Sequence, residues 1–360
     1  MIQRRKTGEP LQYILGSVTF LGLPLSTRHP ILIPRPETEL MIGWTLARWK
    51  NRDYRKTRAH MSITQEGKYE DIIPWCKMKE QSNRSVSSFI ASQFRPEPSS
   101  GSSSPTLRIL DLCSGSGNIA LSLHHHMPHR SHIVGCDIHP TAIELSQQNM
   151  ASLNRLYPDH PLGSTCQFHS IDLLEADPTS PLLFELPSSF GSVRNPLVDS
   201  LLNPPDFISR LGLLTPSMNR VNLIVSNPPY IPINELADLQ TEVRDWESPT
   251  ALVSGDDGMQ LLKHIIRAAP TLLYSKQSQT MLEWKPSQSS SSSLPSSDTT
   301  LIDTSDWDVP EIVLEIGSAG QAMELADFLQ SLDFHHLTIH HDMAGLPRWI
   351  AAARKKNVAN

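Results

Sequence analysis

Short apolar runs alternate with longer segments of helical periodicity through most of the chain. Apolar runs bounded by turn residues are typical of buried strands, while apolar positions at helical spacing indicate amphipathic helices. We expect strands at 107–112, 132–137, 166–170, 221–226, 311–316, 336–341 and near 347–353, and helices at 117–126, 140–153, 256–269 and 319–331. Strands and helices that alternate in this way predict parallel βαβ units, so the predicted fold class is α/β.

Several stretches break this periodicity. Residues 51–105 are charged and then rich in Ser and Pro, residues from about 177 to 220 are irregular, and residues 276–308 contain a serine tract. Such compositions are poor material for a packed core and predict disordered inserts, which cost little closure entropy at a surface. We therefore expect an N-terminal hairpin and helix over 1–50, an insert over 51–105, and one α/β domain over 106–360.

A turn of small residues joins the strand at 107–112 to the following helix. Gly115 and Gly117 let the backbone approach a ligand closely, and the helix N-terminus offers unpaired N–H groups. Asp137 ends the next strand, where a carboxylate can accept both hydroxyls of a ribose. The turn matches the dinucleotide fingerprint G-x-G-x-x-A. It also matches the Asp-x-x-x-Gly-x-Gly turn of S-adenosylmethionine (SAM) enzymes.

The position of Asp111 favours SAM over a dinucleotide. A carboxylate beside the turn repels a pyrophosphate, whereas it can attract the ammonium group of SAM. A glycine-rich turn that binds no ligand is the remaining interpretation.

The tetrapeptide Asn227-Pro228-Pro229-Tyr230 follows an apolar run at 221–225. Two prolines prevent further ladder pairing and a helix start, so Asn227 is expected at the carboxyl end of a strand, where ligand crevices of open α/β sheets lie. Its side-chain oxygen and a carbonyl of the rigid Pro-Pro backbone are two acceptors for a planar NH2 group, and Tyr230 offers an apolar face. Holding both N–H bonds can direct the nitrogen at an electrophile. The alternative is an ordinary turn, since Asn and Pro both favour turns.

We interpret a second Asn-Pro-Pro sequence, two histidine runs and the cysteines as structural features rather than as functional sites. Asn203-Pro204-Pro205 repeats the Asn-Pro-Pro core, but Asp206 replaces the aromatic residue and no clear strand precedes it. We expect the histidines at 124–126 and 335–341 at the surface rather than around a metal, because adjacent helix positions face different directions. The four cysteines, Cys76, Cys113, Cys136 and Cys166, show no paired metal spacing, which predicts a reducing compartment.

The net charge of the chain limits the classes of binding partner that the sequence predicts. The formal net charge is −6 at pH 7, which gives no overall basic footprint for nucleic acid. No apolar run in the sequence reaches the length that spans a membrane. The sequence therefore predicts an enzyme core without a metal, a membrane segment or a nucleic-acid partner.

The glycine turn and the Asn-Pro-Pro-Tyr motif, with five further blocks, resemble the class I SAM-dependent N5-glutamine methyltransferases that modify peptide-chain release factors (the HemK/PrmC type). The blocks follow the family's order and, with the two motifs, account for somewhat over half of the chain: 8–16, 33–39, 242–244 with 249–252, 314–317 with Gln321, and 342–345 with Arg348. The resemblance implies a Rossmann-like sheet of seven strands, mostly parallel, with an antiparallel final strand inserted between its neighbours, and an N-terminal β-hairpin. Residues 106–360 would then form the methyltransferase domain.

The resemblance also implies roles for individual residues. The methionine part of SAM would lie on the turn, the ribose on Asp137, and the adenine beside Leu173, which follows Asp172. The turn residues concerned are Asp111, Ser114, Gly115, Ser116 and Gly117. Asn227, which also borders the cofactor, and the Pro228 carbonyl would bind a glutamine carboxamide, with Pro229 and Tyr230 completing the substrate site. The catalytic set would be Asn227, Pro228 and Tyr230, without a general base.

The implied reaction is methyl transfer from SAM to the side-chain amide of the Gln in a Gly-Gly-Gln release-factor loop. An N6-adenine nucleic-acid methyltransferase and a non-catalytic SAM- or partner-binding relative are the alternatives, and a dehydrogenase is a more distant one. The chain departs from the family in two places: only Met1–Thr7 precede the 8–16 block, where members carry a helical bundle, and Ser248 separates Glu247 from Pro249. Residues 1–50 would be the remnant of a substrate-docking region. Mitochondrial location is implied by the resemblance alone, with the cytoplasm as the other expectation.

Overall fold

The computed structural model describes residues 1–50, 107–127, 131–158, 162, 166–173, 221–273, 309–342 and 344–354. The predicted inserts at 51–105, 177–220 and 276–308, the second Asn-Pro-Pro and Cys76 lie outside these residues. Every structural statement below concerns the described part of the chain.

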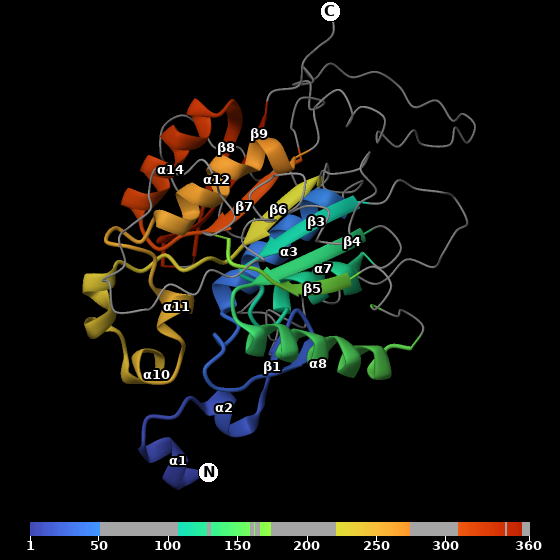
Figure 1. The fold of residues 1–360 in the computed structure, drawn as a ribbon, viewed down its shortest axis with the longest axis vertical. Coiled ribbons are helices and arrows are strands. Elements are labelled where there is room, and N and C mark those ends of the chain that lie inside the picture. Colours follow the sequence, from blue (N-terminus) through green and yellow to red (C-terminus); the bar gives the residue numbers. More distant parts are fainter. Residues whose placement is uncertain are drawn as a thin grey trace, which may run out of the picture.

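A seven-stranded sheet forms the centre of the molecule, in the order β5-β4-β3-β6-β7-β9-β8 (Figure 1). Its strands are β3 (Leu107–Leu112), β4 (Ser131–Asp137), β5 (Cys166–Ser170), β6 (Leu223–Ser226), β7 (Ile312–Glu315), β8 (Phe334–His341) and β9 (Pro347–Arg354). β9 is antiparallel to both of its neighbours, β7 and β8, whereas the pairs from β5 to β7 are parallel. The predicted class I methyltransferase sheet, including its inserted antiparallel final strand, is therefore confirmed.

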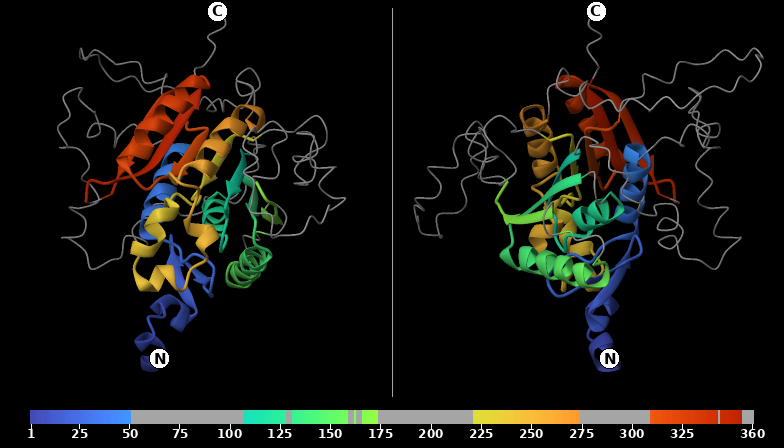
Figure 2. Two further views of the ribbon diagram at one scale, coloured as in Figure 1. Left: turned by 60° about the vertical axis from the view of Figure 1, so that its left-hand side comes forward. Right: turned by 90° about the vertical axis from the view of Figure 1, so that its right-hand side faces the viewer.

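Helices cover both faces of the sheet, as the two views of Figure 2 show. The helices on one face are α3 (Pro36–Lys50), α7 (Asn118–His126) and α8 (Pro140–Leu156), and those on the other are α12 (Gln260–Leu272) and α14 (Ala319–Ser331). Successive residues of a strand enter opposite cores: Ile109 packs with α3 and α7, and Leu110 packs with α12 and α14. All four residues of β6 are buried, as expected for a central strand covered on both sides.

The N-terminal part contains the predicted hairpin, formed by β1 (Ser17–Phe20) and β2 (Leu23–Ser26), followed by the predicted helix α3. Two short helices that the sequence analysis did not predict, α1 (Ile2–Lys6) and α2 (Leu11–Leu15), precede the hairpin. The connection after β6 also contains short helices: η2 (Ile233–Asp238), α10 (Thr241–Arg244) and α11 (Pro249–Leu252). None of the helices in the described residues is both long and apolar enough to cross a membrane.

The prediction that the histidine run is exposed is wrong. His124, His125 and His126 are 1%, 9% and 4% exposed, because α7 lies between the sheet and other helices and is buried along almost its whole length. His126 Nε2 lies 3.2 Å from the carbonyl of Leu21, and His125 packs against Tyr157. These rings therefore belong to the core. The second run is divided, since His335 and His336 are exposed while His340 stacks on Trp349.

Candidate active site

The glycine turn and the Asn-Pro-Pro-Tyr motif lie at the carboxyl ends of adjacent strands. β3 and β6 are parallel neighbours, with Leu112 paired to Ser226 as the last pair of the ladder. The Ser226 hydroxyl donates a hydrogen bond of 2.6 Å to the Leu112 carbonyl. Asn227 therefore leaves the sheet beside the first residue of the turn, at about one strand spacing. β3 and β6 also flank the point where strand order reverses, where open α/β sheets bind ligands.

Asp111 lies beneath the turn rather than on its surface. Its side chain is fully buried, and Oδ2 accepts hydrogen bonds from Ser114 Oγ (2.9 Å) and the Ala120 N–H (3.1 Å). Burial raises the pKa of the Asp111 carboxyl to about 8, and those two bonds oppose the rise. Oδ1 is buried with no hydrogen-bond partner among the described residues. Such an orphaned oxygen is what a bound donor, such as an ammonium group or water, satisfies.

The glycines of the turn differ in what surrounds them. A Cβ on Gly117 would lie 2.9 Å from Ser146 Cβ, so this residue is needed for packing against α8. Among the described residues, the nearest atom to a Cβ on Gly115 would belong to Ile31, at 4.0 Å. Both have positive φ, which glycine adopts without strain. The backbone at Gly115 therefore offers space to a ligand, while Ser114 and Ser116 are buried within the turn.

Asp137 fixes the turn from the end of the neighbouring strand. Its Oδ2 accepts the Gly115 N–H at 2.8 Å, and its Oδ1 accepts the His139 N–H at 2.9 Å. Burial raises the pKa of Asp137, and these backbone hydrogen bonds oppose the rise. A carboxylate oxygen accepts about two hydrogen bonds, so each oxygen retains capacity for one more donor, as a ribose diol requires.

The residues predicted beside the adenine follow β5. Asp172 and Leu173 are both half-buried, and Leu173 packs against the core on the α12 and α14 face. The ends of β3, β4 and β5 thus hold the predicted SAM-binding residues other than Asn227 in one row, in the order of the strands. The row could hold an elongated cofactor with a charged end, a diol and a flat ring.

Asn227 is oriented by a chain of hydrogen bonds that the sequence did not reveal. Its Nδ2 donates to Thr38 Oγ1 at 3.0 Å, and Thr38 Oγ1 donates to Glu315 Oε2 at 2.6 Å. Thr38 belongs to α3 and Glu315 ends β7, and both are almost completely buried. With its NH2 group engaged, half-buried Asn227 keeps its Oδ1, which has no partner among the described residues, as an acceptor.

Tyr230 is braced from several sides. Its hydroxyl donates to Glu315 Oε1 at 3.2 Å, and its backbone carbonyl accepts from Gln321 Nε2 at 2.8 Å. A Cβ on Gly317 would lie 2.8 Å from the Tyr230 ring, and one on Gly258 would lie 2.2 Å from its carbonyl oxygen. Burial and then the Glu315 carboxylate raise the pKa of Tyr230. The ring is therefore held as a neutral, fixed wall.

The prolines between these two residues are buried, so the backbone of the motif is fixed by packing as well as by its covalent geometry. The carbonyl of Pro228 accepts no hydrogen bond from the described residues. Asn227, Pro228 and Tyr230 thus lie together just after β6, and Thr38, Glu315 and Gln321 make hydrogen bonds that hold Asn227 and Tyr230.

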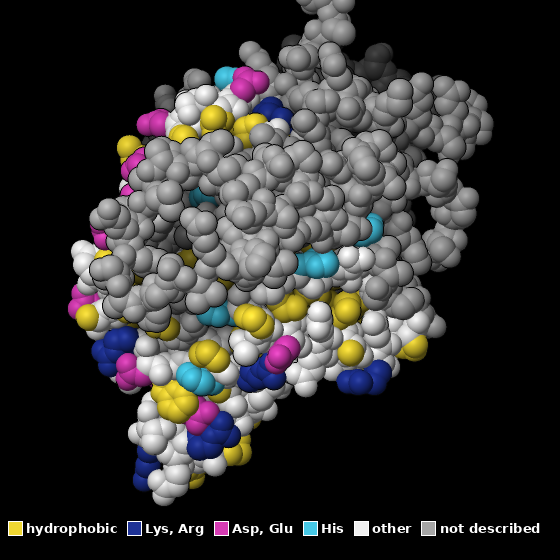
Figure 3. All heavy atoms as spheres, viewed as in Figure 1, with side chains coloured by type: hydrophobic (Ala, Val, Ile, Leu, Met, Phe, Trp, Pro, Cys, Tyr) yellow, Lys and Arg dark blue, Asp and Glu magenta, His cyan; other side chains and the backbone are white. Residues whose placement is uncertain are grey.

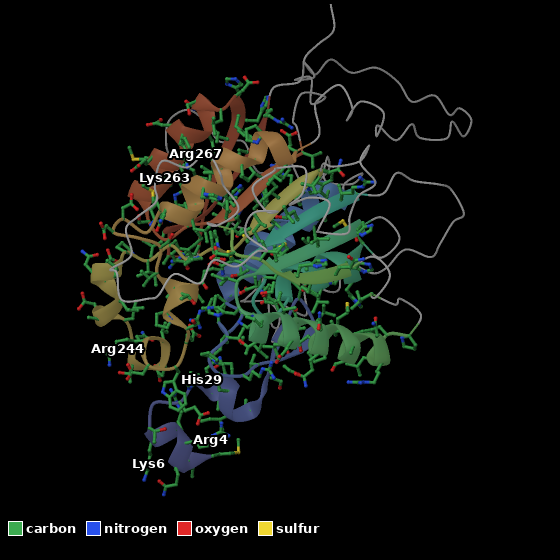
Figure 4. All side chains as sticks on the ribbon, in the orientation of Figure 1. Arg4, Lys6, His29, Arg244, Lys263 and Arg267 are labelled. Carbon is green, nitrogen blue, oxygen red and sulfur yellow. The ribbon has the colours of Figure 1, made fainter. Side chains whose placement is uncertain are left out.

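The N-terminal region is fastened to the segment that follows the motif. Glu247 pairs with Arg35 and accepts the Ile33 N–H at 3.3 Å, and the Ser248 N–H donates to the Pro30 carbonyl at 2.8 Å. Figure 4 shows His29 beside this junction, where its Nδ1 lies 2.6 Å from the Trp246 carbonyl. Glu247, which Ser248 separates from Pro249, therefore holds the N-terminal region against the segment that follows the motif.

Three curated proteins similar to this chain carry the same activity in their names. The chain is 27% identical to the release factor glutamine methyltransferase of Streptomyces coelicolor over 76% of its length and 62% of that protein. It is 28% identical to the enzyme of the same name from Geobacter sulfurreducens, over 76% and 60% of the two chains. It is also 28% identical to the human MTRF1L release factor glutamine methyltransferase, over 75% and 54%. The chain thus spans 54–62% of the length of these relatives.

No family model matches the chain. Among solved structures, the hMettl16 catalytic domain in complex with a MAT2A 3′UTR hairpin matches at 11% identity with a TM-score of 0.39, over 71% of this chain and 66% of that one. A likeness of this size carries no information on substrate.

Proposed function

We propose that this chain is a SAM-dependent methyltransferase that modifies the side-chain amide nitrogen of the glutamine in a Gly-Gly-Gln loop of a peptide-chain release factor. The observation that carries the proposal is the pairing of Leu112 with Ser226, because it joins a cofactor-type turn to an amide-type acceptor pair at one sheet edge. The relatives' shared name supports the same substrate class.

The residues at the ends of β3, β4 and β5 fit SAM in charge and shape. The orphaned Oδ1 of Asp111 lies under the turn, Gly115 leaves room above it, and Asp137 retains acceptor capacity for a diol. When bound, SAM supplies an electrophilic methyl group on a sulfonium sulfur. The ammonium group of SAM would favour the ionised form of Asp111, whereas the pyrophosphate of a dinucleotide would disfavour it.

On the substrate side, the chain's own residues bind and orient an amide. Asn227 Oδ1 and the Pro228 carbonyl each accept one N–H of a carboxamide, and Tyr230 packs on its plane. These contacts hold the nitrogen in line with the electrophile, so positioning supplies much of the rate. The proton that leaves the methylated nitrogen can pass to water, so no side chain is assigned as a general base.

The described part of one face of the molecule carries no basic patch of the kind that binds nucleic acid. Figure 3 shows basic and acidic side chains interspersed over the described part of this face, without a continuous basic patch. Contacts to phosphates supply much of the affinity of proteins for nucleic acid and come mainly from Lys and Arg. The amide of a protein loop needs no such patch. Mitochondrial location, implied by the resemblance, stays a prediction.

The test is methyl transfer from labelled SAM to defined acceptors. We expect label on a release factor with a Gly-Gly-Gln loop, none on the same factor with Gly-Gly-Ala, and none on single- or double-stranded oligonucleotides. Mass spectrometry should place the methyl group on the glutamine side chain. Label on the oligonucleotides alone would establish the N6-adenine alternative, and SAM binding without transfer to any acceptor would establish the non-catalytic one.

A further inference from the structure

The buried carboxyl group of Glu315 is not used by the chemistry described so far. Glu315 is 1% exposed at the end of β7, and its two oxygens accept from different residues of the amide side of the site. Thr38 Oγ1 donates to Oε2 at 2.6 Å, and the Tyr230 hydroxyl donates to Oε1 at 3.2 Å. One carboxylate therefore holds both the group that orients Asn227 and the ring that packs on the substrate.

The direction of these hydrogen bonds decides which atom Asn227 presents. A threonine hydroxyl has one proton, and Thr38 gives it to Glu315, so the Thr38 oxygen can only accept from Asn227. The Asn227 NH2 group must then face Thr38, which turns Oδ1 the other way. A carboxylate accepts but never donates, so the ionised form of Glu315 enforces this order.

Protonation of Glu315 would remove that constraint. A neutral carboxyl group can donate its proton to Thr38, and the Thr38 proton can then be donated to Asn227 Oδ1 instead. The Asn227 amide would be free to turn over and present NH2 to the substrate, where it would face the substrate's own NH2. The site would lose one of its two acceptors without any change in the backbone.

We propose that Glu315 is a positioning residue whose ionised form, acting through Thr38, sets the amide of Asn227 in its acceptor orientation. The inference deepens the proposed function and rests on it for its kinetic consequences. Neither Thr38 nor Glu315 touches the substrate in this scheme, since both act through Asn227 and Tyr230.

The residues around Glu315 place its protonation in a pH range that experiments can reach. The titratable or charged side chains that act on Glu315 are Tyr230 from the loop after β6, Glu37 from α3 and Arg348 from β9. Burial raises the pKa of Glu315 to about 7, with Glu37 adding to the rise, while the bonds from Thr38 and Tyr230 and the charge of Arg348 oppose it. Arg348 is itself held by Asp342 at 2.7 Å.

The kinetic test compares turnover at pH 8 with turnover at pH 6. A group that titrates at about 7 changes its ionised fraction about tenfold across that interval, so the wild type should lose about tenfold in kcat from this source. Glu315→Gln cannot change its protonation, so its ratio of the two rates should be about tenfold smaller than that of the wild type. Replacing Glu315 with Gln should change the affinity for SAM little, whether it is measured at pH 6 or at pH 8. An unchanged ratio in Glu315→Gln would overturn the proposal.

A second set of variants covers the case in which Glu315→Gln does not fold. Thr38→Val removes the hydroxyl and should lower kcat about tenfold, which corresponds to the free energy of one hydrogen bond. The dependence of kcat on pH that comes from Glu315 should disappear as well. Thr38→Ser keeps the hydroxyl and should behave as the wild type. Thr45→Val is the matched control, because Thr45 is a buried threonine of the same helix whose hydroxyl donates to the Met41 carbonyl of its own helix. Wild-type rates and pH response in Thr38→Val would refute the relay.

Nuclear magnetic resonance separates this inference from the proposed function. The side-chain NH2 resonances of Asn227, assigned by their loss in Asn227→Ala, should titrate with the same midpoint as the Glu315 carboxyl carbon. In Thr38→Val the Asn227 resonances should no longer follow that midpoint, and the Glu315 pKa should rise because a donor to its charged form is lost. If the linkage is present but no methyl reaches the release factor, the proposed function fails alone. If Asn227 does not follow Glu315, the positioning inference fails.

Discussion

The cofactor half and the amide half of the proposed site are assembled over different distances along the chain. In the cofactor half, the bonds that fix the glycine turn join residues 3, 9 and 22 positions apart. In the amide half, the bonds around Asn227 and Tyr230 join residues 85, 91, 189 and 277 positions apart. One βαβ unit therefore builds the glycine turn and its supports, whereas the amide half requires α3, β6, β7 and α14 to be packed together.

This contrast predicts that the halves can be damaged separately. A change in the local turn should alter cofactor affinity and leave the amide half in place, because its supports come from elsewhere. A change behind Asn227 or Tyr230 should alter turnover and leave cofactor affinity in place. Residues more than about 7–10 Å apart without shared partners usually contribute independently.

The largest effect is expected from Asn227→Ala, which removes the side-chain acceptor of the amide half. We expect kcat to fall by about a hundredfold or more, as when one preorganised polar group is removed from an active site, with SAM affinity changed by less than about twofold. Methyl transfer and isothermal titration measure the two quantities. Asn203→Ala is the matched control, because it removes the asparagine of the other Asn-Pro-Pro and should leave both unchanged. Normal turnover in Asn227→Ala would contradict the assignment.

The reciprocal change in the cofactor half is Asp137→Asn. Both oxygens of Asp137 accept a backbone N–H, and an asparagine can offer only one oxygen, so one N–H would face an NH2 group. The loss of a hydrogen bond to a charged group should weaken SAM binding by about thirtyfold. At saturating SAM, kcat should fall far less than in Asn227→Ala. Asp238→Asn, on the exposed surface of η2, is the control for the loss of one charge. Equal losses of affinity in the two variants would show that charge alone matters.

The cofactor half could be predicted from the sequence because its partners are contiguous. Asp111, Gly115, Gly117 and Asp137 belong to one strand–turn–helix–strand pattern, whose spacing reports the geometry directly. Asn227 and Tyr230 were found in the same way, from the apolar run and prolines around them. The strands and long helices followed from periodicity, although boundaries moved by a few residues, as in α12, which begins at Gln260 rather than 256.

The supports of the amide half could not be predicted in this way. Thr38 and Gln321 are ordinary helix residues in the sequence, and only the fold brings them to Asn227 and Tyr230. Glu315 offered a signal, since an acid ends its apolar strand just as Asp137 ends β4. The histidines of α7 were misplaced for a related reason, because imidazoles occur at intermediate burial and their sequence does not show which faces are covered.

A steric test of the amide half is Gly258→Ala against Gly345→Ala. Both glycines have positive φ, of 73° and 78°, so both variants carry the left-handed strain of about 1–2 kcal/mol. At Gly258 the new Cβ would collide, 2.2 Å from the Tyr230 carbonyl oxygen, whereas at Gly345 no atom of the described residues lies within 4 Å. We expect about a tenfold loss of kcat in Gly258→Ala beyond any change in Gly345→Ala, since small displacements in an active site are costly.

Urea unfolding and SAM titration of the same pair complete that test. Gly258→Ala should be the less stable variant, because the displaced backbone adds to the strain that both share. Its affinity for SAM should stay close to that of the wild type. A parallel loss of SAM affinity would mean that the two halves are coupled, and that the separation drawn from the hydrogen bonds is wrong.

The smallest expected effect is on the pH dependence of stability. It differs between the two halves, because each contains a buried carboxyl group with a different pKa. Burial raises the pKa of Asp111 to about 8 and that of Glu315 to about 7, above their values in the unfolded chain. The folded state then holds more protons than the unfolded state, so stability falls as pH rises through these values. From pH 7 to pH 8.5 the Asp111 contribution is about 1 kcal/mol, or about 2–4 °C in Tm, and that of Glu315 is smaller. Calorimetry should show this slope in the wild type and in Glu315→Gln, and its near loss in Asp111→Asn. An equal slope in Asp111→Asn would mean that the cofactor half does not carry the titrating group.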